Sequence, residues 1–124
     1  MTLKTKSIRA PISPEDGLRI CVMRSYDRAK HPEYQETDQH IVELSPSRDL
    51  LEALHAGLSW EDYVARFSRE VLIPQQDRIR DLARQAIERN ITLLCYEETP
   101  ENCHRRLLAL ACQMYQPKLE LVLG

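Results

Sequence analysis

The sequence lacks an apolar run long enough to cross a bilayer, and it has no excess of charge of one sign. Its 17 basic and 19 acidic side chains give a formal net charge of -2, which offers no overall attraction to nucleic acids. The N-terminal residues lack the apolar core of a secretory signal. We therefore expect a soluble, cytoplasmic protein with no membrane partner, in which nucleic-acid binding requires a local basic patch.

Internal repeats, low-complexity tracts and linkers are also absent, so nothing in the sequence divides the chain. Its 124 residues are enough for one core, and 43% hydrophobic with 29% charged residues is a globular composition. Without an export signal, the 4 cysteines are expected to be free thiols. We expect residues 1–124 to form a single domain, whose oligomeric state the sequence does not predict.

Short apolar runs alternate with helical stripes along most of the chain, after a proline-containing lead-in. Strands are predicted at residues 18–24, 40–44, 91–96 and 118–123, and helices at residues 45–55, 59–71, 74–90 and 99–115. Parallel strands need crossover connections, which the helices would supply. The sequence therefore predicts an α/β fold, a compact domain of two or three layers with a small, mainly parallel sheet and flanking helices.

The stretch CYEETPENCHRR, residues 95–106, concentrates thiols, carboxylates, an imidazole and guanidiniums in a few residues. Its threonine and proline, at positions 99 and 100, predict a helix start. On the helical wheel Cys103 lies on the buried face, where a free cysteine is commonly a small apolar residue. His104 lies on the flank of that face and Arg105 on the solvent-facing arc.

The position of this stretch favours a ligand site, because ligands of open parallel sheets bind beyond the carboxyl ends of the strands. A helix start attracts anions and lowers the pKa of a cysteine, so Cys103 is either a reactive thiolate or a buried apolar residue. Three glutamates near the helix start would repel a phosphate. One of them, Glu97, is either a general base or orienting group, or part of a surface salt bridge.

The spacing of these residues argues against two other kinds of site. Cys95, Cys103 and His104 offer three metal ligands, but no second close pair accompanies them, and adjacent ligands on a helix diverge by about 100°. A thiol phosphatase loop needs an arginine six positions after its cysteine, where this chain has Glu101 and Ala109. We therefore expect no metal and no cofactor.

The motif LLCYE stands at residues 93–97, CHR follows at residues 103–105, and the first strand ends in Arg24. This combination resembles the bacterial family known as domain of unknown function 488. The resemblance implies a compact α/β fold and a cytoplasmic bacterial protein, and it brings no settled activity. Family members often have an acidic residue before the first-strand arginine, whereas Val22 and Met23 stand here.

Three hypotheses about function follow from these residues. In the first, which we favour, the protein is an enzyme that acts on a small anionic or nucleotide-like ligand. Arg24 and Arg105 would bind the anion, because a guanidinium holds carboxylate or phosphate through two hydrogen bonds. Glu97 and His104 would serve as acid and base, and Cys103 as a nucleophile or hydrogen-bond donor.

The other two hypotheses need no catalysis. A binding or regulatory module could contact nucleic acid through basic and tyrosine side chains of the long loop, although acidic residues of the same loop dilute their charge. These side chains are Arg24, Tyr26, Arg28, Lys30, His31 and Tyr34. Alternatively, the polar residues of the candidate site form a buried network that only stabilises the fold, since buried polar groups need partners.

Overall fold

The structure is a computed structural model that describes residues 1–97 and 102–124. The strands are β1 (Thr2–Ser7), β2 (Leu18–Cys21), β3 (Gln39–His40), β4 (Ile91–Cys95) and β5 (Glu120–Leu123). The helices are α1 (Arg48–His55), α2 (Trp60–Phe67), α3 (Gln76–Glu88) and α4 (His104–Tyr115).

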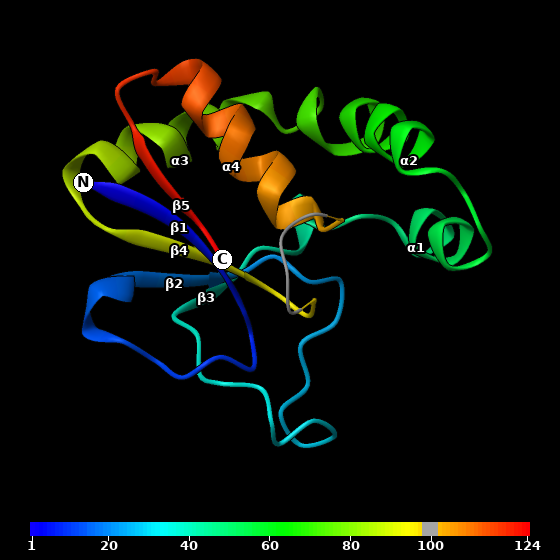
Figure 1. Cartoon of the computed structure of the whole chain (residues 1–124), viewed down its shortest axis with the longest axis horizontal. Coiled ribbons are helices and arrows are strands. Elements are labelled where there is room, and N and C mark those ends of the chain that lie inside the picture. Colours follow the sequence, from blue (N-terminus) through cyan, green and yellow to red (C-terminus); the bar gives the residue numbers. More distant parts are fainter. Residues whose placement is uncertain (98–101) are drawn as a thin grey trace.

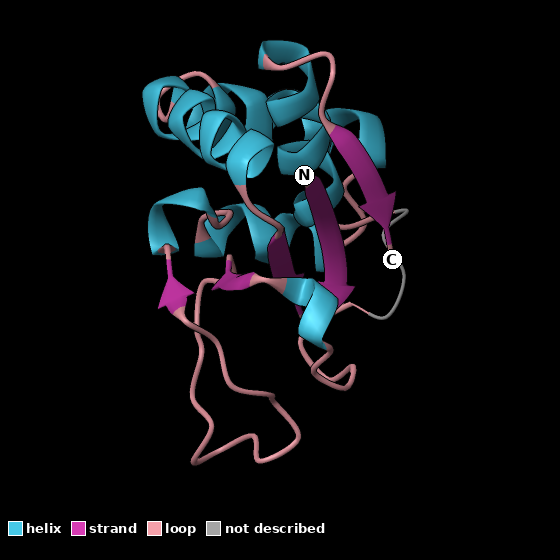
Figure 2. Ribbon diagram, turned by 90° about the vertical axis from the view of Figure 1, so that its left-hand side faces the viewer, coloured by secondary structure: helices cyan, strands magenta, loops and turns pink. Residues whose placement is uncertain are grey.

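One five-stranded sheet has the order β3-β2-β4-β1-β5, and every neighbouring pair is parallel (Figure 1). The central strand β4 is buried along its whole length, as expected for an apolar strand that pairs on both sides. Figures 1 and 2 show α3 and α4 on one side of the sheet, and the long loop of residues 22–38 extends on the other. The predicted α/β fold with a parallel sheet and flanking helices is thus confirmed.

The first strand, β1, was not predicted, because residues 2–7 read as a polar lead-in. Its burial alternates along the strand, with Leu3, Thr5 and Ser7 buried while the residues between them are half-buried. This alternation is the period of a strand with one wetter face, and two lysines hide it in the sequence. The strand nevertheless lies between β4 and β5 and is internal to the sheet.

All four predicted strands are shorter than expected, the first two by three residues each. The strand predicted at residues 18–24 ends at Cys21, and the one predicted at residues 40–44 ends at His40. After His40 the chain turns into a short 3-10 helix at Val42–Leu44, which brings Leu44 into the core at 0% exposure. Core packing of Leu44 therefore prevails over continued pairing of the strand.

Serine caps begin both α1 and α2, and the cap Ser59 of α2 is the one that the sequence predicts, with Asp62 three residues later. The Ser47 hydroxyl accepts a hydrogen bond from Leu50 N, and the Ser59 hydroxyl accepts one from Asp62 N, both at 3.1 Å. A π-helical turn at Ser68–Leu72 then continues α2, and Pro74 lies in the turn before α3 instead of in its first turn. Among the described residues, none of the helices has the length and apolar character of a membrane span.

Candidate functional site

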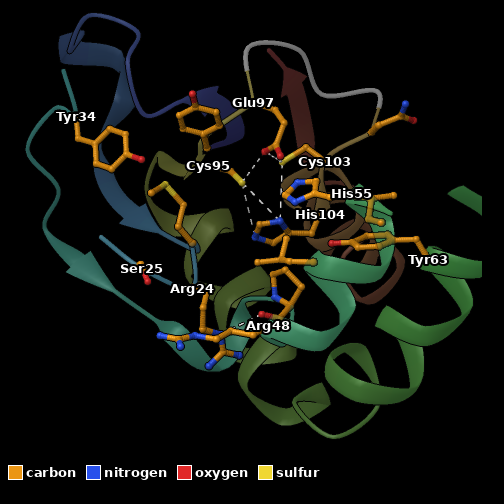
Figure 3. A pocket seen from close by; sticks show the side chains of 16 residues that line it. Arg24, Ser25, Tyr34, Arg48, His55, Tyr63, Cys95, Glu97, Cys103 and His104 are labelled. Carbon is orange, nitrogen blue, oxygen red and sulfur yellow. Dashed lines mark hydrogen bonds between the residues drawn. The ribbon is translucent and has the colours of Figure 1, made fainter. Parts of the chain in front are cut away.

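A pocket of about 510 Å³ opens beyond the carboxyl ends of β2 and β4, at the edge of the sheet where the sequence predicted a site (Figure 3). Its lining comes from the loop after β2, from α1 with the residue before its cap, from α2, from the end of β4 and the two residues after it, and from the start of α4 with the two residues before it. The lining residues are Met23, Arg24, Ser25, Tyr34, Pro46, Arg48, Leu51, Leu54, His55, Tyr63, Cys95, Tyr96, Glu97, Asn102, Cys103 and His104.

Four polar side chains meet on one wall of this pocket, and we call Cys95, Glu97, Cys103 and His104 the thiol cluster. Both thiols donate to the same carboxylate oxygen, Glu97 Oε2, at 3.2 Å from Cys95 and 3.3 Å from Cys103. The Nδ1 atom of His104 lies 3.5 Å from the sulfur of Cys95 and 3.9 Å from that of Cys103. Residues from the end of β4 and from the start of α4 thus form one hydrogen-bonded group.

The imidazole of His104 is held from its other side. Its Nε2 lies 2.6 Å from the carbonyl oxygen of Val22, just after β2, and its ring is 5.7 Å from the ring of Phe67. A carbonyl oxygen can only accept, so Nε2 carries the proton and Nδ1 presents a lone pair to the sulfurs. The backbone of the strand edge therefore selects the tautomer.

The sequence predicted Cys103 to lie inside the helix, and this prediction is wrong. It is the N-cap of α4, with the extended dihedrals φ -128° and ψ 141°, and the helix begins at His104. The predicted cap at Thr99 and the proline at position 100 lie outside the described residues. The divergence of about 100° expected for adjacent helical residues therefore does not apply to this pair.

Within the thiol cluster, the pKa values of Cys103 and Glu97 are shifted in opposite directions. Burial raises the pKa of the Cys103 thiol, which is the opposite of the lowering expected from a helix start. Burial also tends to raise the pKa of Glu97, but hydrogen bonds from Cys95, from its own backbone N–H and from Cys103 together outweigh it and lower the pKa below its usual value. At neutral pH Glu97 is thus a carboxylate, and Cys103 on its own is a thiol.

Arg105 is fully buried, at 0% exposure, and the prediction of a solvent-facing position is wrong. Its guanidinium donates to Glu97 O at 2.8 Å, to Gly124 O at 3.0 and 3.2 Å, and to the sulfur of Cys103 at 3.3 Å. The helical wheel gave the wrong exposure for Arg105 because β5 and the residue after it, Gly124, cover this side of α4. Arg105 lies behind the thiol cluster and does not line the pocket.

Arg24, the predicted anion-binding arginine, lines the pocket together with Arg48, which the sequence analysis missed. Arg24 donates through Nε to the carbonyl oxygen of Pro46 at 3.0 Å, which holds it next to the start of α1. Arg48 is the first residue of α1 and is exposed, and it makes no hydrogen bond or ion pair with another residue in the described part of the chain. The only sequence signal for Arg48 was its position directly after the cap Ser47.

The tyrosines of the long loop are engaged within the loop itself. Tyr34 is only 6% exposed and stacks on Tyr26, with ring centroids 6.2 Å apart. The Tyr26 hydroxyl donates to Gln35 O at 2.7 Å, and Arg28 donates to Tyr34 O at 3.0 Å. This packing leaves little of the Tyr34 ring for stacking on a nucleic-acid base.

The comparisons with known proteins give one match. The family model described as DUF488-N3a, the active DUF488-N3 subclade, matches residues 3–115, from β1 to the end of α4. No curated protein and no solved structure matches the chain. The matched range includes every described residue that lines the pocket.

Proposed function

Because the chain belongs to the DUF488 family, in the active DUF488-N3 subclade, we propose that its pocket binds a small ligand with an anionic group and an apolar ring or chain. The description of the subclade as active names no reaction. The proposal therefore depends on the pocket itself.

The observation that carries the proposal is the pairing of two arginines opposite the thiol cluster. Figure 3 shows Arg24 and Arg48 on one side of the pocket, with Cys95, Cys103 and His104 on the other. The two terminal nitrogens of Arg24 make no hydrogen bond to another described residue, so they are available to a carboxylate or phosphate. The two cations have no carboxylate partner among the described residues, which favours an anion between them.

The rest of the lining defines the other part of the ligand. Met23, Leu51 and Leu54 supply apolar surface, and Tyr34 and Tyr63 supply aromatic surface. A volume of about 510 Å³ lies within the range of pockets that enclose a metabolite-sized molecule. A sugar phosphate, a nucleotide or an aromatic acid has this combination of an anionic end and a larger body.

Chemistry on such a ligand would involve the thiol cluster. Glu97 is the ionised group on the pocket wall, so it is our candidate proton acceptor, with Cys95 and Cys103, which both donate to it, as the groups that orient it. Turnover of a bound ligand would identify an enzyme, whereas binding without turnover would identify a regulatory module. Arg105 is reassigned from ligand binding to support of the pocket wall, because it lies behind Cys103.

The test is a thermal-shift panel of nucleotides, sugar phosphates, aromatic acids and inorganic phosphate, with titration calorimetry of any compound that raises Tm. We expect at least one anionic compound to stabilise the wild type, and Arg24→Ala and Arg48→Ala each to weaken its binding by about tenfold or more, as loss of a charged hydrogen bond predicts.

The matched control is Arg89→Ala. Arg89 is exposed and lies two residues before β4, at the end of the strand away from the pocket, so this variant should bind like the wild type. Equal binding by the wild type and by the Arg24→Ala/Arg48→Ala double variant would contradict the proposed site. A panel without any response from the wild type would contradict the ligand class.

A further inference from the structure

We propose that the thiol cluster is a binding site for one divalent transition-metal ion of the zinc type, held by Cys95, Cys103 and His104 with Glu97 in the fourth position. The inference does not depend on anion binding by Arg24 and Arg48, which lie on the opposite wall of the pocket, and with a metal bound Glu97 would be a ligand of the ion in place of the proton acceptor proposed above. It reverses the expectation from spacing alone, whose premise that Cys103 lies within the helix is wrong.

The distances within the cluster are close to those of a tetrahedral site. The possible ligand atoms of the two cysteines and the histidine all lie within 4.8 Å of one another. A zinc ion with bonds of about 2.3 Å to sulfur and about 2.0 Å to nitrogen separates neighbouring ligand atoms by roughly 3.5–3.8 Å. The sulfur-to-Nδ1 distances of 3.5 and 3.9 Å already match this geometry.

Glu97 is the candidate for the fourth position, next to the group of three ligands formed by the two cysteines and the histidine. Its Oε2 atom lies 3.2 Å from one sulfur and 3.3 Å from the other, so it is in contact with both cysteine ligands. A carboxylate oxygen is an ordinary ligand of zinc alongside sulfur and nitrogen. Glu97 is half-buried while Cys95 and Cys103 are buried, so the fourth position is the one that faces the pocket.

The orientation of His104 is that of a metal ligand with its outer partner in place. Metal-binding histidines commonly donate their second ring N–H to a carbonyl or carboxylate, which fixes the ring. Here Nε2 donates to Val22 O at 2.6 Å, and Nδ1 directs its lone pair toward the sulfurs. The ring therefore needs no rotation to bind an ion.

Arg105 supplies the compensating charge. Two thiolates and a carboxylate around a divalent ion carry a net charge of -1, which is costly in a buried site without a cation. The fully buried Arg105 donates to the sulfur of Cys103 at 3.3 Å, and its other bonds go to carbonyl oxygens in the described part of the chain. A neutral thiol gives a buried guanidinium no negative charge to offset. A thiolate bound to a metal in this site does, because the positive charge of Arg105 then offsets the net charge of -1.

The experiment uses the full chain, reduced and treated with a strong chelator, and titrates it with cobalt(II) as a spectroscopic probe. We expect saturation at one ion per chain, with the intense visible bands of tetrahedral cobalt and a sulfur-to-cobalt charge-transfer band. Zinc should displace cobalt, and each ion bound should release about two protons, one from each thiol, to the buffer.

Three variants locate the site. Cys95→Ser and Cys103→Ser should each lose the charge-transfer intensity of one sulfur and weaken cobalt binding by at least 100-fold, while Glu97→Gln should weaken it less. Cys112→Ser is the matched control, because Cys112 is a buried thiol elsewhere on α4 and should leave binding unchanged. Arg24→Ala should also bind cobalt normally, which separates this site from the anion site.

Circular dichroism establishes that each variant is folded, and the wild-type spectrum and proton release test the site even if a cysteine variant fails to fold. The proposal is overturned if the reduced wild type binds cobalt only weakly and with octahedral spectra. It is also overturned if Cys95→Ser and Cys103→Ser keep the wild-type spectrum, or if the two cysteines form a disulfide so readily that the reduced protein cannot be loaded.

Discussion

His104 Nε2 and the carbonyl oxygen of Val22 are 2.6 Å apart, although 82 positions separate the two residues in the sequence. The contact joins the start of α4 to the segment after β2, and it is buried. These two segments form adjoining walls of the pocket. A single hydrogen bond therefore holds the pocket in shape and fixes the tautomer of the imidazole.

Replacing His104 with alanine should lower the free energy of unfolding by about 2–4 kcal/mol, because it leaves a cavity beside Phe67 and a buried carbonyl without its donor. Urea denaturation measures the change. His55→Ala is the control, since His55 is exposed on α1 and its loss should change stability by no more than about 0.5 kcal/mol. Equal effects of the two substitutions would contradict the role assigned to His104.

The fold could be read from the sequence where the signal is local. The apolar run of β4 and the serine cap of α2 depend on residues within a few positions of one another, and both predictions hold. The strand β1 could not be recognised, because its alternation includes lysines and its neighbours β4 and β5 are far away in the sequence.

The candidate site could be read only in part, for the same reason. The sequence located Cys103, His104 and Glu97, but the burial of Arg105 depends on Gly124, 19 positions away. The role of Arg48 depends on a pocket formed by segments distant in sequence. Tertiary contacts of this kind leave no periodic pattern.

Asp16 is the centre of a buried ion network on the opposite face of the sheet from α4. Lys6 donates to both of its oxygens at 2.9 Å and Arg19 donates at 2.5 Å, while Asp16 is 1% exposed. Asp16→Asn would leave two cations without their carboxylate, and we expect a loss of about 3–5 kcal/mol in urea denaturation. Asp81→Asn is the control, because Asp81 is half-buried on α3 and its partner Arg84 is exposed.

The same network predicts how stability depends on pH. Burial tends to raise the pKa of Asp16, but hydrogen bonds from Lys6, the Ser13 backbone and Arg19 outweigh it and hold the pKa below its ordinary value of 3.8. The stabilisation is therefore complete above about pH 5, where the carboxyl is ionised even in the unfolded chain, and it is lost progressively as pH falls below the ordinary value and through the lower folded pKa. Acid titration of the free energy of unfolding should show this loss in the wild type and a shallower one in Asp16→Asn.

Two thiols outside the thiol cluster should resist alkylation in the folded protein. Burial raises the pKa of Cys21 to about 11 and that of Cys112 to about 12, and both side chains are 0% exposed. Iodoacetamide at pH 8 should label them slowly in native buffer and quickly in denaturant, because only unfolding exposes them. Peptide mapping by mass spectrometry separates the sites, and rapid native labelling of either one would contradict the burial described.

Gly17 is required by two separate features of its position between the 3-10 helix Pro14–Asp16 and β2. Its φ of +62° favours glycine, and an added Cβ would lie 2.1 Å from the carbonyl oxygen of Asn90, which already accepts from Leu18 N. Gly57 separates the two effects, because its φ is +112° but a Cβ there would meet open space.

Gly57→Ala should therefore cost only the backbone strain, about 1–3 kcal/mol, whereas Gly17→Ala should cost clearly more, because it must also push β2 away from the end of α3. Urea denaturation of the two variants gives the comparison, and the excess for Gly17→Ala measures the steric conflict with Asn90. Equal losses would mean that the chain at Asn90 can shift without cost. The close approach of Gly17 to Asn90 would then not be what aligns β2 with β4.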